Sequence, residues 1–318
     1  MTTPALATKR CHEILDEVER AVVGKRDVLE LVLLGILATG HVLIEDLPGL
    51  GKTLMARSFA TVLGLRFTRV QFTPDLLPAD LTGASLYDQR TGDMVFRSGP
   101  VFTNLLLADE INRTPPKTQA ALLEAMAEGQ VSADGESRPL PAPFVVLATD
   151  NPIEYEGTYP LPEAQLDRFT LRVRLGYLSP RGEVEMLSRR LARGSKPSEL
   201  RRVVSAPDVL DLRESLEHVE VEPDILDYVV RLLDATRDHP KITVGASPRG
   251  GLALVQLARG RAVLGGRDYV TPEDIKGVAV PALAHRVTLR PELWVRQIHA
   301  DQVIGDLLDE VPTPRTEP

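Results

Sequence analysis

The sequence is poor in several features that would point to other classes of protein. It has one cysteine, Cys11, among 318 residues, so no disulfide can form within the chain, and we expect a cytoplasmic rather than a secreted protein. The first ten residues carry Lys9 and Arg10 without an apolar segment before them, so they do not predict a secretion signal. The six histidines show no metal-ligand spacing, and no Gly-x-Ser-x-Gly elbow is present, which argues against a zinc site or a serine hydrolase.

Long hydrophobic runs and an excess of basic charge are also missing. The longest apolar stretch, residues 28–44, is interrupted by Glu30, Gly35, Gly40 and His41, so it lacks the roughly 20 consecutive apolar residues of a membrane helix. Acidic residues number 45 and basic residues 37, which gives a formal net charge of -8. This is the wrong sign for a protein held on nucleic acid mainly by phosphate contacts. We therefore expect no membrane segment and no nucleic-acid partner.

Five short apolar runs, each bounded by turn-forming or charged residues, are typical of buried strands. Helical segments follow the first and the third run, at residues 54–62 and 116–128, and two further helices precede the first run. Strands that alternate with helices favour a mostly parallel sheet covered on both faces, which is a three-layer αβα domain. The five predicted strands are residues 41–45, 67–72, 104–109, 144–149 and 169–175.

Two predicted hairpins and a later change of pattern define the rest of the chain. Residues 86–97 contain the turn Thr91-Gly92-Asp93 and residues 130–143 contain Asp134-Gly135, so both predict hairpins inserted into the α/β plan. From Ser179 onward only helical patterns follow. We therefore predict an α/β domain over residues 1–178, an all-helical lid domain over 179–311, and a frayed polar tail over 312–318.

The strongest local signal is a glycine-rich loop between the first predicted strand and the helix after it. It reads Asp46-Leu47-Pro48-Gly49-Leu50-Gly51-Lys52-Thr53, and the helix begins near Leu54. Backbone N–H groups of such a phosphate loop hold phosphate oxygens, while the Lys reaches the outer phosphates and the Thr hydroxyl binds Mg²⁺. Residues 46–54 are thus predicted to bind ATP. Asp46 departs from the strict motif, because that position is usually Gly.

A second strand ends in two adjacent carboxylates. The segment Leu105-Leu106-Leu107-Ala108-Asp109-Glu110 is an apolar strand whose last residues are expected near the phosphates. Asp109 is predicted to hold the Mg²⁺ together with Thr53, and Glu110 to orient and polarise the attacking water in an in-line phosphoryl transfer.

With these motifs the sequence resembles the AAA+ ATPases, and within them the MoxR family, over nearly its whole length. The resemblance implies a ring, most simply a hexamer, that binds and hydrolyses Mg-ATP between subunits. It also implies a chaperone-like task of remodelling or activating partner proteins. The phrases that carry it are Val22-Val23-Gly24, the loop of residues 45–53, residues 71–83 (QFTPDLLPADLTG), Gly99-Pro100-Val101-Phe102, and residues 107–119 (LADEINRTPPKTQ).

The resemblance also suggests roles for residues outside the two motifs. Asn151, just past the fourth predicted strand, looks like the sensor that positions the attacking water. Arg168 resembles the arginine finger that reaches a neighbouring subunit's nucleotide and stabilises charge on the transferring phosphoryl group. Arg249, at the start of a lid helix, resembles a second sensor that contacts the γ-phosphate. Val23 and Gly24 match the segment that packs near the adenine.

The sequence leaves the identity of the partner open. By resemblance the clients are proteins, including ones with a von Willebrand factor A domain or a metal cofactor, and the two hairpins either contact them or are solvated loops. One alternative is an AAA+ motor that acts on DNA, but residues 130–143 hold only Arg138 against Asp134 and Glu136. Another is a nucleotide-gated scaffold with little turnover, which Glu110, Asn151 and Arg168 argue against.

Overall fold

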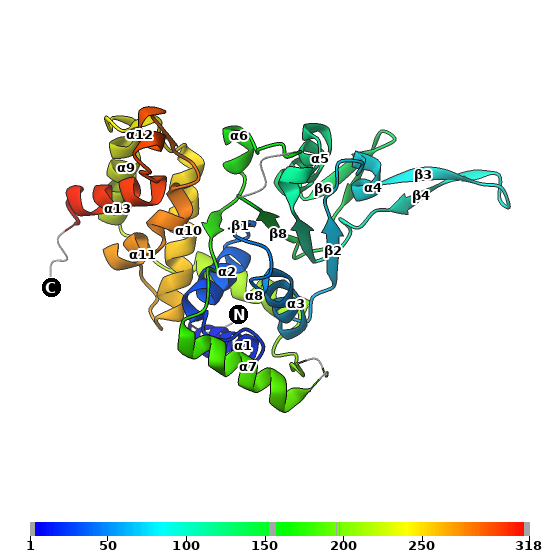
Figure 1. Cartoon of the computed structure of the whole chain (residues 1–318), viewed down its shortest axis with the longest axis horizontal. Helices are drawn as coiled ribbons and strands as arrows, with labels where there is room; N and C mark the ends of the chain where they lie inside the picture. The colour runs from blue at the N-terminus through cyan, green and yellow to red at the C-terminus, as the bar shows by residue number, and fades with distance from the viewer. Residues whose placement is uncertain (1–3, 153–156, 195, 197, 315–318) are drawn as a thin grey trace.

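The computed structural model of the chain describes residues 4–152, 157–194, 196 and 198–314. Its centre is a parallel sheet of five strands in the order β2-β5-β8-β1-β9 (Figure 1). All five predicted strands are confirmed, with ends that differ by a few residues. The strands are β1 (Val42–Glu45), β2 (Phe67–Gln71), β5 (Leu105–Asp109), β8 (Val145–Asp150) and β9 (Leu171–Val173).

Apolar side chains project from both faces of this sheet into hydrophobic clusters, so the sheet is buried on both sides. In β1, Val42 and Ile44 face one hydrophobic cluster and Leu43 faces the other. Leu106 shares the second cluster with Leu122 of α5, as expected for a parallel sheet covered by helices. The helices of this part are α1 (Pro4–Glu19), α2 (Arg26–Leu37), α3 (Lys52–Val62), α4 (Pro78–Thr82), α5 (Pro116–Glu128) and α6 (Glu163–Leu166), with the 3₁₀ turn η1 (Ile111–Arg113).

Both predicted hairpins are present. The first, β3 (Gly83–Asp88) and β4 (Asp93–Ser98), projects away from the rest of the molecule (Figure 1). Its base is closely packed, since a Cβ at Gly99 would lie 2.1 Å from the carbonyl oxygen of Leu81. The second hairpin is β6 (Gln130–Ala133) and β7 (Glu136–Pro139).

The C-terminal part is helical, as predicted, with one correction. Strands β10 (Ile242–Val244) and β11 (Thr288–Leu289) form a short antiparallel pair within it, so it is not all-helical. The first hydrophobic cluster continues from α1–α3 into these helices. Residues 315–318 of the predicted frayed tail lie outside the described residues. The helices are α7 (Pro180–Arg193), α8 (Ala206–Glu217), α9 (Pro223–Arg237), α10 (Pro248–Leu264), α11 (Pro272–Leu283), α12 (Glu292–Val295) and α13 (Ala300–Glu310).

No helix among the described residues combines the length and the apolar composition needed to cross a membrane.

Candidate nucleotide site

The predicted phosphate loop joins β1 to the N-terminus of α3. Gly49 and Gly51 have φ angles of 85° and 89°, a region that favours glycine over other residues. A Cβ at either position would meet no atom within 4 Å, so the space beside the loop is open. With helix α3 beginning at Lys52, the loop offers the unpaired N–H groups of a helix N-terminus to an anion.

Lys52 and Asp46 fix the shape of this loop. Lys52 is 8% exposed, and its Nζ donates to the backbone oxygen of Asp46 at 2.6 Å. Burial lowers the pKa of the Lys52 ammonium, an effect that the nearby carboxylates of Asp46 and Asp109 oppose. The Asp46 carboxylate accepts the N–H of Leu47 at 2.9 Å and that of Gly176 at 2.7 Å. The residue that departs from the motif therefore ties the loop to the segment after β9.

The two acids after β5 are held in different ways. Thr149 of β8 donates its hydroxyl to Asp109 Oδ1 at 2.7 Å and accepts the backbone N–H of Glu110 at 2.8 Å. Glu110 has a φ of 57°, a left-handed turn that ends the strand. Its Oε2 accepts hydrogen bonds from Gln71 Nε2 at 2.8 Å and from Arg113 Nη1 at 3.0 Å.

Sequence reasoning missed Arg69 and Gln71 of β2. Arg69 donates from Nε and Nη2 to Asp109 Oδ2, at 3.0 and 2.7 Å, and from Nη2 to Gln71 Oε1 at 2.8 Å. The parallel pairing of β2 with β5 sets Gln71 opposite Asp109. Two polar residues at alternate positions of a strand were the available signal, because such residues share one face of the sheet.

These residues surround a cavity of about 380 Å³. The cavity unites the predicted phosphate residue Lys52, the predicted metal residues Thr53 and Asp109, Glu110, and the predicted sensor Asn151. Val23, Gly24, Asp46, Leu47, Leu50 and Leu54 are not in its lining, which comprises Pro48, Gly49, Gly51, Lys52, Thr53, Arg69, Gln71, Asp109, Glu110 and Asn151.

The donor set suits Mg²⁺ bound together with a nucleotide. Thr53 and Asp109 supply oxygen atoms, the ligand type that Mg²⁺ prefers. Among the described residues, no group of three or more His, Cys, Asp or Glu side chains could hold a metal ion.

The two predicted arginines lie elsewhere. Arg168 and Arg249 line a separate cavity of about 310 Å³, together with Asp167 and Arg286. Arg168 donates from Nη1 to the backbone oxygen of Leu123 at 2.5 Å. Within the described chain, neither arginine lines the cavity that contains Lys52.

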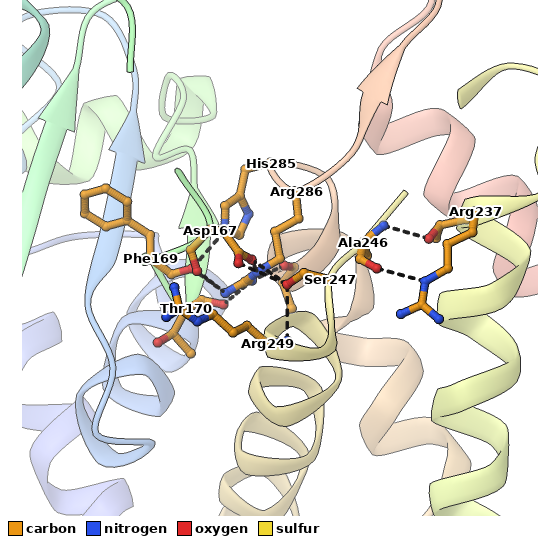
Figure 2. Close-up of polar contacts among 11 residues, drawn as sticks. Asp167, Phe169, Thr170, Arg237, Ala246, Ser247, Arg249, His285 and Arg286 are labelled. Atoms are coloured by element: carbon orange, nitrogen blue, oxygen red, sulfur yellow. Dashed lines mark hydrogen bonds and ion pairs between the residues drawn. The ribbon is translucent and has the colours of Figure 1, made fainter. Parts of the chain in front are cut away.

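A polar cluster fastens the segment next to Arg168 to the lid helices (Figure 2). The hydroxyl of Ser247 donates to both carboxylate oxygens of Asp167, at 3.1 and 3.0 Å, and accepts the N–H of Arg249 at 3.2 Å. Arg286 donates to Asp167 Oδ1 at 2.9 Å and to the backbone oxygen of Phe169 at 2.6 Å. Ser247 caps helix α10 by accepting the N–H of Arg249, and Asp167 is the residue before Arg168, so these bonds tie the start of α10 to the segment that carries Arg168.

Known proteins resemble this chain in sequence and in fold. The sequence profile of the ATPase family associated with various cellular activities (AAA) matches residues 41–171, and that of the AAA lid domain matches residues 234–307. The chain is 43% identical to Chaperone MoxR1 of Mycobacterium tuberculosis over 94% of this chain and 81% of that protein. It is 48% identical to the uncharacterized protein YeaC of Bacillus subtilis over 94% and 93% of the two chains.

The chain belongs to the MoxR family of AAA+ ATPases. A solved structure of a protein from Cytophaga hutchinsonii has the same fold, with a TM-score of 0.91, 41% sequence identity, and coverage of 98% of this chain and 97% of that one. The resemblance read from the sequence motifs is therefore confirmed at the level of the family.

In this MoxR-family chain, a second polar network joins the phosphate-loop strand to the lid. Arg172 of β9 and Arg174, which follows β9, both pair with Glu45 at the end of β1 and with Asp301 of α13. The Arg172 Nη2 to Asp301 Oδ1 distance is 2.8 Å, and the Arg174 Nε to Glu45 Oε2 distance is also 2.8 Å. Next to this network, burial, reinforced by the charge of Glu45, raises the pKa of Asp150 to about 6.

Proposed function

We propose that this MoxR-family protein binds Mg-ATP in the cavity beside the phosphate loop and hydrolyses it. The observation that carries the proposal is the meeting of Lys52, Thr53, Asp109, Glu110 and Asn151 around one cavity. Lys52 would hold the outer phosphates, and Thr53 and Asp109 would hold the metal ion. Bound Mg²⁺ would neutralise charge on the phosphates. Glu110 would accept a hydrogen bond from the attacking water, with Asn151 beside it.

The reaction would be completed by a neighbouring subunit. Arg168 and Arg249 share a cavity that is separate from the one with Lys52, which supports a site shared between two copies of the chain. A guanidinium from a neighbour can raise phosphoryl-transfer rates by about 10³ to 10⁵. Such head-to-tail contacts close into a ring, and we propose a hexamer.

The proposed task is chaperone-like remodelling of partner proteins in the cytoplasm, including partners with a von Willebrand factor A domain or a metal cofactor. The projecting β3–β4 hairpin exposes four large apolar side chains, Leu86, Tyr87, Met94 and Val95, which supports contact with protein. The other hairpin does not favour DNA. Its Arg138 pairs with Glu136 at 2.6 Å and lies 4.0 Å from the ring centre of Phe96, so this basic group is already engaged within the chain.

Two substitutions test nucleotide binding and turnover separately. Lys52→Ala removes the loop cation and should abolish binding of a fluorescent ATP analogue. Glu110→Gln keeps the size of the side chain and the binding, but phosphate release should fall by about 10² to 10⁴ because the general base is lost. Unchanged nucleotide affinity of Lys52→Ala would refute the site, and wild-type phosphate release by Glu110→Gln would remove Glu110 from the base role.

Mixing two inactive variants tests the shared site. An Arg168→Ala subunit keeps Glu110, and a Glu110→Gln subunit keeps Arg168, so a mixed ring contains some interfaces with both groups. We expect phosphate release to recover in the mixture and to stay low in either variant alone. Absence of recovery in mixtures that have assembled, as judged by light scattering, would contradict the action of Arg168 on a neighbour.

A further inference from the structure

Asp109 already has a cation on one of its two carboxylate oxygens. Its Oδ1 accepts the hydroxyl of Thr149, and its Oδ2 accepts two N–H groups of Arg69, at 3.0 and 2.7 Å. A carboxylate oxygen has two lone pairs, so both acceptor sites of Oδ2 are used by one guanidinium. A metal ion, or a water bound to it, that reaches this oxygen must replace Arg69.

The two partners differ in their freedom to move. The Asp109 side chain is 12% exposed and that of Arg69 is 46% exposed. Asp109 is fixed by Thr149 from the neighbouring strand β8, whereas the Arg69 head is held by Asp109 and by Gln71 of its own strand. A buried carboxylate without a bonded cation is costly. Lys52 lies near Asp109 but donates to the backbone oxygen of Asp46, so Arg69 supplies the positive charge that is bonded to Asp109 itself until another cation arrives.

We propose that Arg69 is a displaceable counterion of the metal-site carboxylate. It holds Asp109 in the metal-free protein and is exchanged for Mg²⁺ when Mg-nucleotide binds, and this inference rests on the proposed nucleotide function. The exchange makes Arg69 a competitor of Mg²⁺, so the protein binds the metal more weakly than the same carboxylate would without Arg69. Arg69 is thus a positioning residue that sets the Mg²⁺ concentration at which the site fills.

The test is a Mg²⁺ titration of nucleotide binding, without reference to turnover. A fluorescent ATP analogue is held at fixed concentration, and binding is followed as Mg²⁺ is added to wild type and to Arg69→Met, which keeps the length of the side chain but has neither charge nor donors. Loss of a half-exposed charge pair should lower the half-saturating Mg²⁺ concentration by about two- to tenfold. Arg69→Lys keeps the charge but cannot donate two N–H groups from one planar guanidinium. Its half-saturating Mg²⁺ concentration should lie between those of wild type and Arg69→Met.

A matched control separates competition at Asp109 from a general change in charge. Arg66 lies at the other end of β2, just before its first residue, Phe67. Arg66→Met removes the same charge and should leave the half-saturating Mg²⁺ concentration at the wild-type value. Thermal melting of each variant confirms that it is folded.

The outcomes are distinguishable. A half-saturating Mg²⁺ concentration that is unchanged or higher in Arg69→Met would overturn the counterion role, as would complete loss of nucleotide binding in that variant, since Arg69 would then be a phosphate ligand. An equal shift in Arg66→Met would also overturn it. If wild type binds no nucleotide, the proposed function fails instead.

Discussion

The pH dependence of stability at Asp150 can be worked out from the structure. Asp150 ends β8, one residue before Asn151, and burial together with the charge of Glu45 raises its pKa from 3.8 to about 6. The N–H of Asn151 and the charges of Lys52 and Arg172 act in the opposite direction. The Asp150 carboxyl group therefore binds its proton more tightly in the folded protein than in the unfolded chain.

The difference between the folded and unfolded pKa values sets the direction in which stability changes with pH. Because the folded pKa lies above the unfolded one, the contribution of Asp150 to stability is fully present below about pH 4 and is lost as the pH rises through about 6. The difference between 3.8 and about 6 corresponds to roughly 3 kcal/mol, at about 1.36 kcal/mol per pKa unit. Partial exposure reduces this figure, so we expect the charged group to cost about 1–3 kcal/mol at pH 8.

Asp150→Asn removes the charge and keeps the shape of the side chain. The variant should therefore be more stable than wild type by about 1–3 kcal/mol at pH 8, and the gap should shrink as the pH falls from 7 to 5. Urea unfolding followed by circular dichroism at a series of pH values measures the gap. Asp93→Asn, at an exposed position of the projecting hairpin, makes the same change in net charge and should show no such trend. A gap that is constant with pH, or a wild type that is more stable at pH 8, would refute the reasoning.

Three further substitutions address the contacts around the lid and the hairpin. Asp301→Asn weakens the bonds to Arg172 and Arg174 and should cost about 1 kcal/mol in urea unfolding, more than Asp306→Asn on the same helix, whose pair with Lys241 is exposed. Asp167→Asn leaves the guanidinium of Arg286, which is 3% exposed, without its carboxylate; it should cost about 3 kcal/mol and lower ATP turnover, with nucleotide affinity preserved. Gly99→Ala places a methyl group against the carbonyl of Leu81 and should distort the base of the β3–β4 hairpin, which hydrogen exchange of residues 83–98 would detect; wild-type protection there would contradict the close packing.

The sheet was predictable because its strands are short apolar runs that reach both faces. Residues such as Val42, Leu43 and Ile44 are all buried. Such a continuous apolar run identifies a strand even when its neighbouring strands are not known. The same holds for the loop and the acid pair, since each is a continuous stretch of sequence. The pairing of Arg69 with Asp109 joins positions 40 residues apart, and it depends on the strand order, which local pattern does not specify.

The role of Asp46 was also not predictable from the sequence. In the sequence, Asp46 is only a residue that stands where the phosphate-loop motif usually has glycine. In the fold, the Asp46 carboxylate accepts the N–H of Leu47 within the loop and the N–H of Gly176 after β9. A side chain with no glycine-like freedom can stand there because the flexible positions are Gly49 and Gly51, which carry the positive φ angles. The departure from the motif therefore replaces local freedom with a tertiary bond that joins the loop to the segment after β9.

The positions of the arginines bear on what one subunit can do alone. Among the described residues, the cations that line the cavity beside the phosphate loop are Lys52 and Arg69, and Arg69 is bonded to Asp109. Arg168 and Arg249 line the other cavity, where a bond between Ser247, which caps α10, and Asp167, next to Arg168, links the segments that carry them. An isolated subunit should therefore bind nucleotide but transfer phosphate slowly, because no neighbouring subunit brings the guanidinium of Arg168 to the charge that develops on the phosphoryl group. Turnover per subunit should then rise with protein concentration as rings assemble, while nucleotide affinity changes little, and a turnover independent of concentration across the assembly range would contradict a shared site.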